Sequence, residues 1–282
     1  MRAYDHEPLS KHTTLNIGGP ARRFLIPESP QELIDAVTTC RRRRTPYVVL
    51  GRGSNVLVSD RPLKKVVIKN TEACRHLAQP EPHIVEAGSS VPLQELIRFC
   101  VERDLYGMEY LSSVPGNVGG AIAMNAGRGL VAHAAISEYL ESVEVFDGVA
   151  RRTVTKAEGQ FAYRASVFQR RPWVILGARF RLPAQPRAVG EAEIAERMAL
   201  ARERQDYSGP NAGSVFGRHF PFAKAMMGRR IHGAKFSDKT PNWIVNTGHA
   251  RFRDVTRLIA LAQWHHVLRG RRMPELEWVI VR

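Results

Sequence analysis

The stretch from Gly107 to Gly127, GMEYLSSVPGNVGGAIAMNAG, constrains the fold of this chain more than any other segment. Its centre, residues 115–121, reads PGNVGGA. Glycines at this density allow positive φ angles and let backbone amides approach a ligand without an intervening Cβ. Successive amides in such a loop form a concave site for an anion, typically a phosphate. Because the flanks are apolar, the stretch predicts either a tight turn between buried elements or a phosphate-binding loop set into a core.

A second glycine loop, GRGSN at residues 51–55, favours the phosphate-binding alternative. It follows a predicted strand, YVVL, and precedes the strand-like segments VLVSD and KKVVIKN. A dinucleotide-binding GxGxxG fingerprint needs a third glycine and a following helix, whereas this chain has Val56 at the third place. We therefore reject a Rossmann fold. Arg52, Ser54 and Asn55 would instead offer a positive charge, a hydroxyl and an amide to phosphate oxygens.

Length and cysteine content limit the class of protein. A chain of 282 residues is long enough for two compact cores, and the Pro- and Gly-bearing segment 183–190 is the predicted boundary. No apolar run approaches the ~20 residues needed to cross a bilayer, and the first residues lack the apolar region of a secretion signal. The three cysteines have no metal-ligand spacing and suit a reducing compartment. We expect a cytoplasmic protein with no bound metal and no membrane partner.

The net charge of +15, from 42 basic and 27 acidic residues, is the one unusual feature of the composition. Nucleic-acid binding would explain this balance. However, the arginines are scattered along the chain, and no nucleic-acid-binding motif accompanies them. A polyanionic small substrate explains the same balance, so we expect no nucleic-acid partner.

Local patterns predict alternating helices and strands. Ser29, Pro30 and Glu32 form the capping signature of an amphipathic helix that ends at the run of four arginines, residues 41–44. Further helices are predicted at 92–103, 191–205 and 252–268. Strands are predicted on both sides of a turn within 14–26, at 83–88, 140–147, 150–155, 172–182, 242–246 and 273–281. This order is typical of an α+β protein.

Six segments, in this order, resemble the UDP-N-acetylenolpyruvoylglucosamine reductase family: TLNIGGPARRF, GRGSNVLVSD, MEYLSSVPGNVGGAIAMNAG, YRASVF, NAGSVF and NWIVNTG. The resemblance spans nearly the whole chain and is to the compact branch that lacks an extra tyrosine-bearing loop. It implies an α+β fold with a vanillyl-alcohol-oxidase-type FAD-binding module of two subdomains and a C-terminal α+β substrate-binding domain. The implied boundaries are 1–75 and 76–183 for the FAD-binding subdomains and 184–282 for the substrate-binding domain.

The resemblance also implies a chemistry. FAD, reduced by NADPH, would deliver hydride to the enolpyruvyl group of UDP-N-acetylglucosamine enolpyruvate and give UDP-N-acetylmuramate for peptidoglycan. Because VPGNVGGA contains neither His nor Cys, non-covalent FAD is expected. Arg164 matches the arginine that stabilises the developing enolate, Ser214 the serine that donates a proton, and Glu275 the glutamate that polarises the substrate. From the residues alone, Ser214 would be a helix or turn cap and Glu275 a solvated strand end. The apolar neighbours of Arg164 argue against a merely solvated arginine, and covering apolar surface with its stem is the alternative to a functional role.

The resemblance assigns two further sets of residues. The implied cofactor-binding residues lie in the two glycine loops and next to them: Gly51, Arg52, Gly53, Ser54, Asn55, Gly88, Ser113, Pro115, Gly116, Asn117, Gly119, Gly120, Ala121 and Asn125. The implied substrate-binding residues come from the C-terminal third: Asn211, Gly213, Arg218, Arg229, Lys235 and Asn242.

The substrate-binding segments depart from the family pattern. Gly217, Arg218 and His219 follow GSVF where the family usually has Lys-Asn-Pro, and Lys235 stands where the family tends to have glutamine. Either neighbouring basic residues supply the pyrophosphate contacts, or the pocket accepts a related enolpyruvyl substrate of a specialised pathway. A flavin oxidase of the same fold superfamily and a flavin- or nucleic-acid-binding protein without turnover remain the alternative functions.

Overall fold

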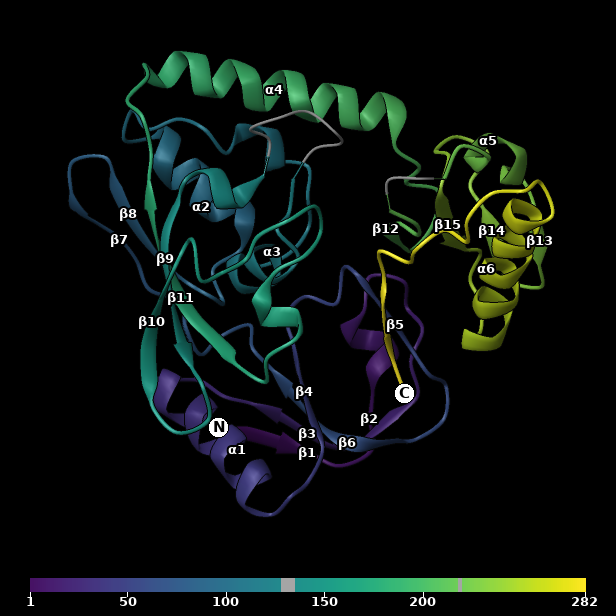
Figure 1. Ribbon diagram of the computed structural model, residues 1–282, viewed down its shortest axis with the longest axis horizontal. Coiled ribbons are helices and arrows are strands. Elements are labelled where there is room, and N and C mark those ends of the chain that lie inside the picture. Colours follow the sequence, from purple (N-terminus) through teal and green to yellow (C-terminus); the bar gives the residue numbers. More distant parts are fainter. Residues whose placement is uncertain (128–134, 218–219) are drawn as a thin grey trace. The chain divides into compact units, whose positions relative to one another are not determined.

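The computed structural model describes residues 1–127, 135–217 and 220–282, which form two compact units (Figure 1). The first unit contains residues 1–4, 23–51 and 65–200, and the second contains 5–22, 52–64 and 201–282. Each unit is therefore assembled from segments far apart in the sequence. The division into three consecutive domains stays a prediction.

One sheet of the first unit has the strand order β1–β3–β6–β4, from β1 (Arg2–Tyr4), β3 (Pro20–Ile26), β6 (Leu63–Lys69) and β4 (Tyr47–Leu50). A short strand, β2 (Glu7–Pro8), pairs with the start of β3. Helix α1 (Pro30–Arg42) begins as predicted, because the Ser29 hydroxyl accepts a hydrogen bond from the Glu32 amide at 3.2 Å. Its buried face contacts the core through Leu33, Ala36, Val37 and Cys40.

The strand predicted at the start of 14–26 does not form. The chain makes a short 3₁₀ helix, η1 (Leu9–His12), and then an irregular segment before β3. Asn16 has φ +55°, a left-handed conformation that interrupts an extended strand. Leu15 and Ile17 are nevertheless buried, so their apolar character reflects core packing and not strand pairing.

The second sheet of the first unit is antiparallel, with the order β10–β9–β11–β8–β7. Its strands are β7 (Leu77–Glu81), β8 (Ile84–Gly88), β9 (Leu140–Phe146), β10 (Arg151–Thr155) and β11 (Val174–Arg181). Among the described residues, helices α2 (Leu93–Val101), α3 (Val118–Ala123) and α4 (Arg187–Arg204) and the 3₁₀ turns η2 (Glu109–Leu111), η3 (Ile136–Glu138) and η4 (Val167–Gln169) complete the connections. Helix α4 starts earlier than predicted and takes up part of the proposed linker.

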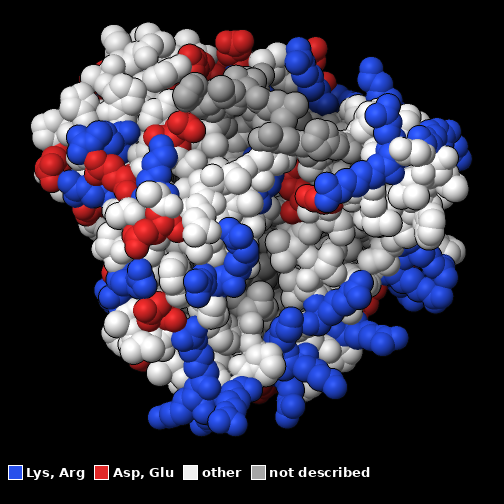
Figure 2. Space-filling model, in the orientation of Figure 1, with Lys and Arg blue, Asp and Glu red and all other residues white. Residues whose placement is uncertain are grey.

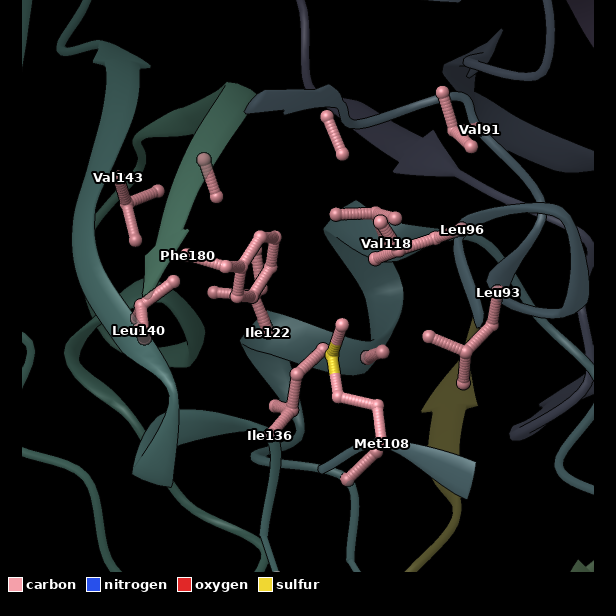
Figure 3. Packing of buried hydrophobic residues seen from close by; sticks show 14 of the residues in the cluster. Val91, Leu93, Leu96, Met108, Val118, Ile122, Ile136, Leu140, Val143 and Phe180 are labelled. Carbon is pink, nitrogen blue, oxygen red and sulfur yellow. The ribbon is translucent and has the colours of Figure 1, made fainter. Parts of the chain in front are cut away.

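A single apolar cluster joins this sheet to α2 and α3, as Figure 3 shows. Val118 and Ile122 of α3 lie among Leu93 and Leu96 of α2 and Phe180 of β11, and all five are fully buried. Burial of each such side chain contributes roughly 1.5–3 kcal/mol. The helix that continues the glycine-rich stretch is therefore fixed by the core on one side.

The second unit contains the sheet β12–β15–β14–β13, from β12 (Asn211–Ser214), β13 (Arg230–Ile231), β14 (Ala234–Phe236) and β15 (Trp243–Asn246). Helices α5 (Ala223–Met226) and α6 (Phe252–Val267) belong to the same unit. A separate parallel pair joins β5 (Val56–Val58) to β16 (Val279–Val281). The strand predicted at 273–281 is shorter than expected, because the residues before β16 make only one isolated bridge, Leu276 with Phe216.

Candidate functional site

Asn70, just after β6, contacts the start of each glycine loop in the first unit. The Asn70 amide donates to the carbonyl of Leu50, immediately before Gly51, at 2.9 Å. The side chain of Asn117 donates to the Asn70 carbonyl at 3.3 Å. The chain therefore brings Gly51 and the start of the 115–121 loop next to Asn70. We call Gly51, Asn70, Ser89, Asn117, Gly119 and Gly120 the glycine cradle.

Buried hydrogen bonds fix the glycine cradle. The Asn70 amide group donates to the Ser89 hydroxyl at 2.9 Å and accepts from the Ser90 hydroxyl at 2.6 Å. Gly119 donates its amide to the Ser89 carbonyl at 3.0 Å. Asn70, Ser89 and Ser90 were not predicted as site residues, although Asn70 ends one predicted strand and the two serines follow another, where ligand-binding residues often lie.

The predicted glycines divide into two classes. A Cβ on Gly51 or Gly120 would meet no heavy atom within 4 Å, so their open side is available to a ligand. A Cβ on Gly119 would lie 2.8 Å from the Ser89 Cβ, and one on Gly88 would lie 2.2 Å from the Cys74 carbonyl oxygen. These two glycines are explained by close packing. The glycine cradle thus has an open face lined by backbone, which suits a phosphate-bearing cofactor such as FAD.

Side chains just before the 115–121 loop in sequence carry unused hydrogen-bonding groups. The hydroxyls of Tyr110, Ser112 and Ser113 are buried and have no hydrogen-bond partner among the residues that the structure describes. Burial raises the pKa of the Tyr110 phenol, so this group remains a protonated donor. Buried groups of this kind are costly unless a ligand or water satisfies them. They fit a cofactor rich in phosphate and hydroxyl oxygens, and Ser113 was predicted for that role.

Arg164 lies at the tip of a tight turn that the glycine-rich stretch holds in place. The turn is closed by the paired backbones of Ala162 and Ala165, and Arg164 has φ +53°. The Asn125 side chain donates to the Ala162 carbonyl at 2.9 Å, and the Ser166 hydroxyl donates to the Ala123 carbonyl at 2.7 Å. Asn125 was predicted to bind cofactor, but its amide group is used to position this turn.

In the second unit, two backbone bonds place Ser214 and Glu275 on adjacent segments. The Gly217 amide donates to the Glu275 carbonyl at 2.9 Å, and the Glu277 amide donates to the Val215 carbonyl at 2.8 Å. Ser214 ends β12 at a half-buried position, whereas the Glu275 carboxylate is 84% exposed, with Arg272 at 3.8 Å. Ser214 and Glu275, 61 positions apart, thus lie on paired segments of one half-site, with Glu275 opposite Gly217.

Two predicted substrate-binding asparagines support this half-site through the backbone. Asn242 accepts from the Phe216 amide at 3.0 Å and donates to the Phe216 carbonyl at 2.8 Å. Asn211 accepts from the Gly213 amide at 3.3 Å, and Gly213 has φ +71° with open space at its Cβ position. Both asparagines therefore shape the loop around Ser214.

The residues of the second glycine loop that follow Gly51 also have structural partners. The Asn55 side chain donates to the Glu277 carbonyl at 3.0 Å. Gly53 has φ +71°, and a Cβ there would lie 2.2 Å from the His12 carbonyl oxygen. Arg52 is exposed and Ser54 half-buried. Asn55 and Gly53 are thus explained by the second unit's own packing.

The basic residues between positions 218 and 235 differ in what they contact. Lys235 forms an ion pair with Asp238, and Arg230 donates to the His232 carbonyl at 2.6 Å. The side chain of Arg229 is exposed. Arg218 lies outside the described residues.

The remaining predicted cofactor residues lie at the 115–121 loop. Pro115 is exposed, the Gly116 carbonyl accepts from the Leu93 amide at 3.0 Å, and Ala121 is buried in α3.

Known proteins resemble this chain over most of its length. An FAD-binding domain family matches residues 21–155, which include most of the glycine cradle's unit. The UDP-N-acetylenolpyruvoylglucosamine reductase of Syntrophobacter fumaroxidans is 38% identical over 92% of this chain and 77% of its own length. A reductase of the same name, numbered 1, from Bacillus cereus is 39% identical over 92% of this chain and 88% of its own.

A solved structure extends the match to the fold. The UDP-N-acetylenolpyruvylglucosamine reductase of Thermus caldophilus covers the whole of both chains with a TM-score of 0.81 and 28% identity. The α+β fold and the FAD cofactor expected from the sequence are thereby confirmed. The chain therefore belongs to the UDP-N-acetylenolpyruvoylglucosamine reductase family, whose members are FAD-dependent oxidoreductases.

Proposed function

We propose that this enzyme uses NADPH to reduce the enolpyruvyl group of UDP-N-acetylglucosamine enolpyruvate and so makes UDP-N-acetylmuramate for peptidoglycan. The names of its relatives support this substrate. The observation that carries the proposal is the pairing of 215–217 with 275–277, which joins the two segments that carry Ser214 and Glu275. A proton donor and a carboxylate on adjacent segments suit a reaction that must protonate a carbanion.

The glycine cradle and the buried hydroxyls beside it would hold the FAD, which when bound supplies the hydride. The open faces of Gly51 and Gly120 would admit its phosphates, and Ser113 would donate to a phosphate oxygen. The Asn70 hydrogen bonds would keep both loops rigid, so that binding does not require them to be ordered first.

Arg164 would stabilise the negative charge that develops toward the substrate carboxylate. Its turn adopts a positive φ, which costs roughly 1–3 kcal/mol and is offset by the Asn125 and Ser166 hydrogen bonds. Ser214 would donate the proton to the carbon α to that carboxylate, and Glu275 would polarise the enolpyruvyl group together with Arg164. Arg164 belongs to the first unit, and Ser214 and Glu275 belong to the second.

The substrate is the finer part of the proposal. Lys235 is paired with Asp238, whereas the side chain of Arg229 is exposed, so Arg229 is the stronger candidate for a pyrophosphate contact. A related enolpyruvyl substrate stays the alternative, because Gly217 replaces the lysine usual in the family. The proposal includes three domains, with the limits 1–75, 76–183 and 184–282. It also includes a cytoplasmic location, which the free cysteines at 40, 74 and 100 suit.

Anaerobic stopped-flow absorbance tests the proposal in two steps. NADPH should bleach the flavin of the purified protein, and UDP-N-acetylglucosamine enolpyruvate should restore its colour within one turnover. Denaturation should release all of the FAD, because the attachment is non-covalent. Reduced flavin that reoxidises with oxygen but ignores the enolpyruvyl substrate would instead identify an oxidase.

A further inference from the structure

Helix α6 carries an exposed apolar stripe on the side away from its own core. Leu261, Trp264 and Leu268 at its end are 45%, 61% and 79% exposed. With 3.6 residues per turn, these three residues and Arg253 and Arg257 fall within an arc of about 80°. The opposite side of the helix is buried in the second unit through Val255, Leu258, Ile259 and Ala262.

Basic residues flank this apolar stripe along the chain. The carboxylates near it are at the two ends of the helix: Asp60 accepts from the Phe252 amide at 2.7 Å, and Glu275 lies 3.8 Å from Arg272. Arg253 and Arg257 precede it on the same side of α6, and exposed arginines at 269, 271 and 272 follow it. The one acidic residue between positions 251 and 272 is Asp254, which is buried and accepts from the Arg251 amide at 3.0 Å. Figure 2 shows Lys and Arg side chains over the part of the surface where α6 lies in Figure 1.

We propose that this stripe, Leu261, Trp264 and Leu268 with its flanking arginines, binds the surface of an anionic phospholipid bilayer. Helices that lie at a bilayer surface combine Trp and Leu at the depth of the acyl boundary with Arg near the lipid phosphates. Trp264 is suited to that depth because its ring is amphipathic. The net charge of +15 adds attraction toward any anionic surface.

A lipid surface fits these residues better than a protein partner does. A stable protein interface takes about 800 Å² and 20–30 residues from each partner. This stripe offers three large apolar side chains on one helix, and a fluid bilayer needs no matching shape. None of the described helices is long and apolar enough to cross a membrane, so the helix would lie on the surface. The expectation of no membrane partner rested on the lack of a crossing segment, which surface binding does not require.

Co-sedimentation of the full-length holoenzyme with vesicles tests this inference. The protein should pellet with vesicles of phosphatidylglycerol and phosphatidylcholine at low salt, and much less with pure phosphatidylcholine or at high salt. The triple variant Arg253→Gln, Arg257→Gln, Arg271→Gln should lose about fivefold in partitioning per arginine. Brominated lipid should quench tryptophan emission in the wild type, and Trp264→Phe should remove that quenching.

The matched control is Arg42→Gln with Arg43→Gln, which removes positive charge from the end of α1 and leaves the stripe intact. It should change partitioning far less than the α6 variant. An equal loss in both variants, or equal binding to neutral vesicles, would overturn the inference. So would retention on immobilised polyglutamate without vesicle binding, which would indicate an acidic protein partner. Flavin turnover should be unchanged in every variant. Vesicle binding is measured separately from turnover, so failure of the proposed reaction would not affect the test of membrane binding.

Discussion

The glycine cradle of the first unit and the Ser214 half-site of the second unit use their polar groups differently. In the glycine cradle the side chains of Asn70, Ser89 and Asn117 are buried and bonded within the protein, and the open surface is backbone. In the half-site the backbone is paired, and the side chains of Ser214 and Glu275 reach the surface. A resident cofactor needs a rigid surface, whereas a substrate that enters and leaves needs accessible groups.

This contrast is sharpest at Ser214, where the largest effect is expected. Ser214→Ala should leave flavin reduction by NADPH nearly intact, because that step needs no proton at the substrate carbon. Flavin reoxidation by the enolpyruvyl substrate should slow by about 10⁴-fold, the upper part of the range for general acid catalysis. Stopped-flow absorbance under anaerobic conditions reports both steps. Reoxidation at the wild-type rate would make Ser214 a turn residue and direct attention to Glu275.

Two glycines test whether open and packed positions in the first unit have separate roles. Gly120→Ala places a methyl on the open face of the glycine cradle and should weaken FAD binding about 10- to 100-fold, because overpacking costs roughly 1–3 kcal/mol. The unfolding free energy of its apoprotein should not fall and should rise by up to about 1 kcal/mol, because Gly120 lies within α3, where alanine is favoured over glycine. Gly88→Ala should instead lower that free energy by about 1–3 kcal/mol, since its methyl meets the Cys74 carbonyl. Fluorescence titration with FAD and urea unfolding separate the outcomes, and a reversed pattern would refute the assignment.

A matched pair of asparagines tests the independence of the two regions. Asn70→Ala removes partners from Ser89 and Ser90 and should cost about 1–3 kcal/mol of stability together with part of the bound FAD. Asn242→Ala removes both bonds to Phe216 and should raise the Michaelis constant for the enolpyruvyl substrate while the flavin content stays normal. Absorbance of the purified protein and steady-state kinetics are the measurements. Loss of FAD from the Asn242 variant would mean that the regions are coupled.

The smallest effect on the substrate Michaelis constant is expected from removing the charge of surface arginines. Arg229→Gln should raise the substrate Michaelis constant about tenfold, because a charged hydrogen bond to phosphate is worth about 1.5 kcal/mol. Arg230→Gln should have less effect, since the Arg230 side chain already donates to His232. Arg42→Gln with Arg43→Gln at the end of α1 should have none. Equal small effects in all three variants would show that Arg229 is merely solvated.

Features that depend on neighbours in sequence were predictable. The Ser29 cap of α1, the apolar stripe of α2 and the antiparallel strands between 140 and 182 follow from patterns of a few residues. The loop at Gly51 lies between strands, as the missing third glycine predicted. The family resemblance then supplied the fold, which composition and periodicity restrict only to α+β.

Features that depend on distant segments were not predictable. Asn70 contacts Ser89 and Asn117 across 19 and 47 residues, and no local pattern marks such bonds. The same holds for Gly53 and Gly88, whose packing against the backbone of His12 and Cys74 is visible only in three dimensions. The apolar residues at 14–17 indicated a strand, but burial without pairing satisfies the same pattern.

The parallel pairing of β5 with β16 also affects how the chain folds during its synthesis. Asn55 and Glu277, which are bonded next to that pair, are 222 residues apart. At 5–20 residues per second, the ribosome needs roughly 10–45 s to make the partner of β5. Throughout that interval the edge of Val56–Val58 is unpaired, so a nascent chain exposes a strand that can associate with others. The first unit, whose last residue is 200, is complete well before the second unit receives its final strand.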